Sequence, residues 1–94
     1  METVHLLEKE FQKRGYKDVS INLWNKTYLF VNVKGKPSFY FDLCHRYNKK
    51  CGCQIHSRMV LSPGFFNDMR FIAAFVWRYR NKLQTELSNA ECFA

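Results

Sequence analysis

The chain has 94 residues, of which 47% are hydrophobic and 17% aromatic, and its formal net charge is +7 at pH 7. This length predicts one domain over residues 1–94 with a modest core, and the hydrophobic fraction argues against wholesale disorder. The longest apolar run, Phe71 to Trp77, has seven residues, whereas a membrane-crossing helix needs ~20. Because the N-terminus is amphipathic and lacks a secretory signal, we expect a cytoplasmic protein without a membrane partner, whose four cysteines are thiols.

The first predicted elements are a helix and four strands. Residues 3–14 show a helical pattern, in which Val4, Leu7 and Phe11 form one apolar stripe and Gly15 is a suitable C-terminal stop. Alternating apolar and polar residues then predict the strands, over 19–24, 28–34, 38–44 and 54–61. A three-residue turn places Trp24 opposite Tyr28, and a two-residue turn, which would point Tyr28 inward, stays open as an alternative.

The last predicted element is a helix that begins at Ser62 and Pro63 and runs to about Leu87. The order of helix, strands and helix is similar to that of the double-stranded RNA-binding domain. The chain departs from that domain by its extra strand and by the start of this helix, 62–68, which has no lysine. We therefore expect no clamping of phosphates there and assign no family.

The strands present two different faces, which predicts an α+β fold with a four-stranded antiparallel sheet and both helices on one face. The expected core positions are Val19, Ile21, Leu23, Leu29, Val31, Val33, Phe39, Phe41, Leu43, Ile55, Met59 and Leu61. The opposite face mixes rings with charges, through Trp24, Tyr28, Phe30, Tyr40, His56 and Arg58, with Lys34 and Arg46 at strand ends.

The third and fourth strands suggest two kinds of chemistry. The expected register pairs are Leu43 with Ile55, Asp42 with His56, and Tyr40 with Arg58. A carboxylate beside an imidazole is part of a nucleophilic triad, but no nucleophile motif accompanies it, so a plain cross-strand pair is the favoured interpretation. We expect no enzymatic activity.

Thiols and imidazoles gather in the same region, at Cys44, His45, Cys51, Cys53 and His56. Four such ligands bind zinc tetrahedrally. In the expected register, Cys44 and His56 point outward, and Cys51 and Cys53 lie in a loop beside them. However, the tight Cys-x-Cys spacing is not that of a zinc knuckle, so we favour thiols that pack at a hairpin end, without metal or other cofactor.

The positive charge predicts an acidic partner. Cations gather around the sheet, at Lys26, Lys34, Lys36, Arg46, Lys49, Lys50 and Arg58, and on the last helix, at Arg70, Arg78, Arg80 and Lys82. Cations around exposed rings suit single-stranded nucleic acid, whose bases stack on rings while its phosphates meet the charges. We therefore predict a small non-enzymatic module that binds nucleic acid or a nucleoprotein complex through Trp24, Tyr28, Lys34, Tyr40, Arg46, Lys49, Lys50 and Arg58.

Two further interpretations concern protein partners. Tyr, Trp and Arg also dominate protein–protein interfaces. The alternative function is therefore a small inhibitor or adaptor, of the kind that phages and other mobile elements encode against host defence or regulatory complexes. In addition, the apolar run 71–77 encircles the last helix, which predicts a homodimer through that helix.

Overall fold

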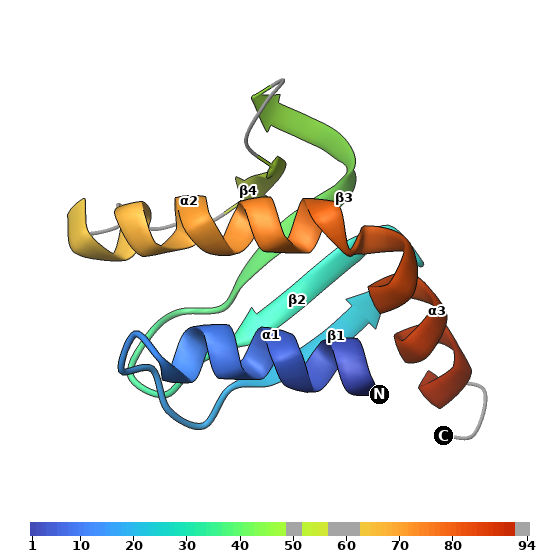
Figure 1. Ribbon diagram of the computed structural model, residues 1–94, viewed down its shortest axis with the longest axis horizontal. Helices are drawn as coiled ribbons and strands as arrows, with labels where there is room; N and C mark the ends of the chain where they lie inside the picture. The colour runs from blue at the N-terminus through green and yellow to red at the C-terminus, as the bar shows by residue number, and fades with distance from the viewer. Residues whose placement is uncertain (49–51, 57–62, 92–94) are drawn as a thin grey trace.

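Three helices and one four-stranded antiparallel sheet make up the fold, which is α+β as predicted (Figure 1). The computed structural model describes residues 1–48, 52–56 and 63–91. Its elements are α1 (Glu2–Gln12), β1 (Ser20–Trp24), β2 (Tyr28–Asn32), β3 (Phe39–Asn48), β4 (Gly52–His56), α2 (Pro63–Arg78) and α3 (Arg80–Glu91). The strands lie in sequence order, β1-β2-β3-β4, so that each strand pairs with the next one along the chain.

The first hairpin has the predicted register. Trp24 pairs with Tyr28, which confirms the three-residue turn. Asn25 and Lys26 adopt φ values of +54° and +58°, the left-handed conformation that matches a tight turn to the twist of the strands. The side chain of Gln84, in α3, donates a hydrogen bond of 2.7 Å to the Lys26 carbonyl. The turn that follows Trp24 is therefore attached to the helix layer.

The predicted pairing of β3 with β4 is wrong by two residues. Ile55 pairs with Phe41 rather than Leu43, and His56 pairs with Tyr40. Beyond Asp42 the register shifts before pairing resumes at Arg46. The cause is local, because the Asp42 carboxylate accepts the Cys44 N–H at 2.9 Å and competes with the regular ladder. β3 is also longer than predicted, and part of the predicted fourth strand, 57–61, lies outside the described residues.

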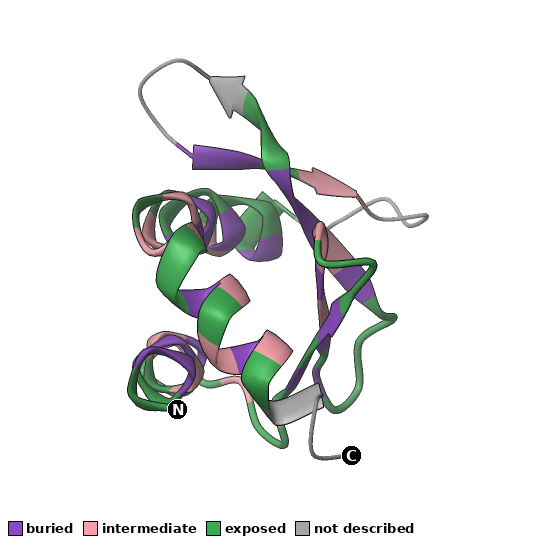
Figure 2. Cartoon of the chain, turned by 90° about the vertical axis from the view of Figure 1, so that its right-hand side faces the viewer, coloured by how far each residue is buried: buried purple, intermediate pink, exposed green. Residues whose placement is uncertain are grey.

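All three helices cover one face of the sheet, as Figure 2 shows, and the buried residues lie between the two layers. Of the expected core positions, eight are buried: Ile21, Leu23, Leu29, Val31, Val33, Phe39, Phe41 and Leu43. Val19 and Ile55 are only partly buried, and Met59 and Leu61 lie outside the described residues. The helices supply the rest of the core, chiefly Phe11, Met69, Ile72, Val76 and Leu83. The opposite face carries no helix in the described part of the chain.

The prediction of a single last helix is wrong, because the helix breaks at Tyr79 into α2 and α3. At this break, the Arg80 guanidinium donates a hydrogen bond of 2.6 Å to the Trp77 carbonyl. After the bend, α3 reaches the start of α1, where the Glu86 carboxylate accepts the Thr3 and Val4 N–H groups at 2.9 and 3.2 Å. These N–H groups have no partner within α1, so Glu86 caps that helix from another element.

Candidate partner-binding face of the sheet

The uncovered face of the sheet carries a continuous row of rings that spans all four strands. Its members are Trp24 of β1, Tyr28 and Phe30 of β2, Tyr40 of β3 and His56 of β4. Neighbouring ring centres lie 4.8–6.1 Å apart. These residues occupy the outward positions of strands whose inward positions form the core, so the period of two places the rings together.

The rings of this row are not equally accessible. Phe30 and Tyr40 stack at 5.0 Å and 28°, and Tyr40 and His56 stack at 4.8 Å and 20°. These three rings are half-buried because they cover one another's faces, whereas Trp24 is 57% exposed. A flat ligand therefore finds free ring surface mainly at the Trp24 end of the row, beside the edge strand β1.

A buried acid lies beneath the other end of the row. Asp42 points to the uncovered face but is only 6% exposed. Its carboxylate meets the Nδ1 atom of His45 at 2.8 Å, the Nε2 atom of His56 at 3.9 Å and the Cys44 N–H. Burial raises the pKa of Asp42, but the three partners together lower it by more than burial raises it. The pKa of Asp42 therefore lies below its ordinary value of 3.8. Asp42 thus contacts two imidazoles, and that of His56 stacks on the Tyr40 ring.

The predicted cations do not all lie on the uncovered face in the described part of the chain. Lys34 follows β2 and lies 3.9 Å from Asp18, with both side chains 74% exposed, so the pair is weak. Arg46 does not lie on the uncovered face, so its predicted placement there is wrong, while its role in partner binding stays a prediction. The register shift after Asp42 turns Arg46 to the helix side, where its guanidinium lies over the Trp77 ring at 5.0 Å. The other predicted cations, Lys49, Lys50 and Arg58, lie outside the described residues.

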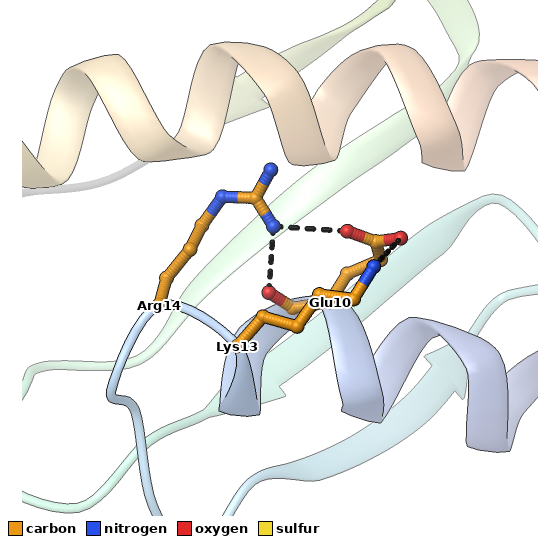
Figure 3. A network of polar contacts seen from close by, with 3 residues as sticks. All are labelled: Glu10, Lys13 and Arg14. Carbon is orange, nitrogen blue, oxygen red and sulfur yellow. Dashed lines mark hydrogen bonds and ion pairs between the residues drawn. The ribbon is translucent and has the colours of Figure 1, made fainter.

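The cations of the helix layer contact groups of the protein itself. Arg14 donates to the Glu10 carboxylate at 2.9 Å and to its carbonyl at 2.7 Å, while Lys13 approaches the same carboxylate at 3.4 Å (Figure 3). Farther along, the Arg80 guanidinium lies 4.1 Å from the centre of the Trp77 ring. Such contacts hold these charges against α1 and α2, on the side opposite the ring row.

The predicted thiol cluster does not come together as expected. Cys53 lies in β4, not in a loop, and its side chain is fully buried on the helix side, where the thiol donates to the Ala73 carbonyl at 3.6 Å. Burial raises the pKa of Cys53 to about 12. Cys44 is exposed and His56 faces away from the core, while Cys51 lies outside the described residues. In the described part, no group of three His, Cys, Asp or Glu side chains is placed to hold a metal ion.

Two asparagines beside Trp24 are absent from the sequence-based prediction. Asn22 and Asn32 line an open hollow together with Trp24 and Phe30. Asn22 stands two residues before Trp24, and Asn32 two residues after Phe30. The alternation that identifies the ring row could therefore have found both, because residues i and i+2 of a strand share a face.

Comparison with known proteins adds no relative: no family model matches the chain, and neither a curated protein nor a solved structure matches it significantly. Among the residues described, no helix combines the length and apolar character that crossing a bilayer requires.

Proposed function

We propose that the chain is a small, non-enzymatic module that binds single-stranded nucleic acid, alone or within a nucleoprotein complex, through the uncovered face of its sheet. The observation that supports this proposal best is the ring row across four strands in a chain of net charge +7. Bases of any sequence can stack on rings, and cations nearby bind the phosphates. The expected cytoplasmic location is compatible with such a role and stays a prediction.

Cations next to the row supply the phosphate contacts in this proposal. Lys26 follows Trp24 in the first hairpin turn, and Lys34 follows β2; both are exposed. The roles predicted for Lys49, Lys50 and Arg58 rest on the sequence alone.

A protein partner is the second candidate, and one observation favours it. Phe30, Tyr40 and His56 stack on one another, so that they offer little free ring face to a base. A flat protein surface could instead cover the whole row. In that case the chain would be an inhibitor or adaptor of the mobile-element kind, acting on a host defence or regulatory complex.

Binding of a labelled single strand at low and high salt separates the two functions. Phosphate contacts make log affinity fall steeply with log salt, by about 0.7 per neutralised phosphate for single strands, whereas an apolar interface responds much less.

Replacing Lys26 and Lys34 with Glu should chiefly slow association, because exposed charges steer the encounter. Trp24→Ala should instead speed dissociation, since a stacked ring holds the complex together. Tyr40→Ala should have a smaller effect, because its ring is already stacked.

The matched control is Phe66→Ala, which removes a ring that is 51% exposed but lies on α2, away from the row. This variant should bind like the unmodified chain. If the unmodified protein does not bind a single strand even at low salt, the nucleic-acid function is wrong and the protein-inhibitor function replaces it.

A further inference from the structure

An open hollow lies on the uncovered face at the edge strand β1. Asn22, Leu23 and Trp24 of β1 and Phe30 and Asn32 of β2 line it, and its volume is about 400 Å³. Ligand sites commonly have ~300–1,000 Å³. The rings of Trp24 and Phe30 stand nearly perpendicular, at 86°, with their centres 6.1 Å apart. A planar group that stacks on one ring therefore meets the other ring at its edge, a favourable aromatic geometry.

The two amides in the hollow keep unused hydrogen-bonding groups. Within the described residues, Asn22 donates one long hydrogen bond, of 3.4 Å, to the Ser20 hydroxyl. The carbonyl oxygen of Asn32 accepts from the Ser38 hydroxyl. An amide side chain has two donor and two acceptor positions. No other residue in the described part of the chain bonds to the Asn22 carbonyl oxygen or the Asn32 amino group. The hollow thus offers one unused carbonyl group and one unused amino group next to the exposed Trp24 ring.

The charges around the hollow favour an anionic chain. Lys26 stands two residues after Trp24, and Lys34 two residues after Asn32, so an exposed cation follows the last lining residue of each strand. Asp18 weakly pairs with Lys34 and is itself exposed. A ligand that extends beyond the hollow along β2 would meet a cation toward each end.

We infer that this hollow holds one base of a single-stranded nucleic acid, stacked against Trp24 with its hydrogen-bonding edge toward Asn22 and Asn32. The inference rests on the proposed function and adds the position and orientation of one nucleotide. A nucleobase combines the required properties: it is flat, its edge carries donors and acceptors, and its backbone is anionic. Asparagine pairs with base edges through its amide in this manner.

Fluorescence of Trp24 tests the inference directly. The chain has two tryptophans, so Trp77→Phe leaves Trp24 as the sole reporter. At low salt, a short single strand should quench its emission, while an abasic strand of equal length should bind through phosphates without quenching. Asn22→Ala combined with Asn32→Ala, made in the unmodified chain, should weaken binding of the base-bearing strand on the order of tenfold. Affinity for the abasic strand should not change.

Asn67→Ala is the matched control, because Asn67 is an exposed asparagine of α2 and should not affect binding. Base-dependent quenching together with loss of affinity in the double variant would support the inference. If strands bind but Trp24 emission and the double variant's affinity stay unchanged, the base position is wrong while the proposed function survives. If no strand binds at low salt, both are wrong. The asparagine variants decide the question even where Trp77→Phe does not fold.

Discussion

At the scale of the residue, Asp42 is the unusual group of this protein, because it is a buried acid on the uncovered side of a sheet. An isolated buried carboxylate is costly, and here three partners offset the cost: the Cys44 N–H, His45 and His56. By accepting the Cys44 amide, Asp42 also fixes the irregularity in β3 that turns Arg46 toward the helices. One side chain thereby influences on which face of the sheet Arg46 lies.

The carboxylate of Asp42 should make stability depend on pH in a defined direction. Its pKa in the folded chain lies below its ordinary value of 3.8. It therefore contributes stability above the unfolded pKa, and that contribution is lost as the pH falls through the folded pKa. Asp42→Asn should destabilise the protein near neutral pH, and the difference from the unmodified chain should narrow below about pH 4.

Urea unfolding followed at several pH values measures this difference. The matched variant is Asp18→Asn, because Asp18 is a mostly exposed carboxylate whose pair with Lys34 is weak. It should change stability little at any of these pH values. A gap between the unmodified chain and Asp42→Asn that stays constant into acid would contradict the assigned role of the carboxylate.

At the scale of the element, β4 and α2 approach each other so closely at Gly52 that no side chain fits there. A Cβ atom added at Gly52 would lie 2.5 Å from the carbonyl carbon and oxygen of Ala73 and 2.7 Å from the Ala74 nitrogen. Gly52 also adopts φ +134°, which other residues rarely do. The start of β4 therefore depends on glycine both for its conformation and for its contact with α2.

Gly52→Ala should lower the free energy of unfolding by about 2 kcal/mol or more, since backbone strain and overpacking each cost ~1–3 kcal/mol. Gly64→Ala is the matched control, because nothing lies within 4 Å of its added Cβ and alanine favours a helix. That variant should be neutral or slightly stabilising. Chemical denaturation of both variants measures the contrast, and equal stabilities would show that β4 can move away from α2 at little cost.

For the strands and helices, the sequence pattern predicts some features correctly and others not. The alternation of apolar and polar residues predicts which face each strand buries, and it gives Trp24, Tyr28 and Tyr40 their common side. The alternation does not distinguish one strand register from another shifted by two residues, because both registers leave every side chain on the same face of the sheet. The observed β3–β4 register differs from the predicted one by such a shift. The break at Tyr79 also gives no local signal, because no proline or glycine stands there.

At the scale of the whole molecule, the aromatic rings of the helix layer and those of the sheet have different neighbours. Rings of the helix layer lie under cations, such as Trp77 beneath Arg46 and Arg80, whereas rings of the ring row pack mainly on one another. The helix layer still has two widely exposed rings on α2, those of Phe66 and Phe71. Within the apolar run, Phe71 is 62% exposed, and the Arg14 guanidinium lies 6.0 Å from its centre. Part of the apolar run 71–77 is buried in the core, so a dimer contact through α2 would centre on Phe71.

We expect Phe71→Glu to shift a dimer to monomer without unfolding the chain, because the side chain is not part of the core. Sedimentation velocity measures the mass, and circular dichroism checks that the fold persists. Such a dimer would leave the ring row open to a ligand. An unmodified protein that sediments as a monomer at high concentration would contradict self-association through α2.

The central claim is that the uncovered face of the sheet is the surface that binds single-stranded nucleic acid. Titration of the isotope-labelled protein with a short single strand, followed by amide chemical shifts at low salt, tests this claim most directly. The largest changes should fall on β1, β2 and β3, near Asn22, Trp24 and Tyr40, and Trp24→Ala should reduce them. Changes confined to α1 and α2, or no changes at all, would contradict the claim.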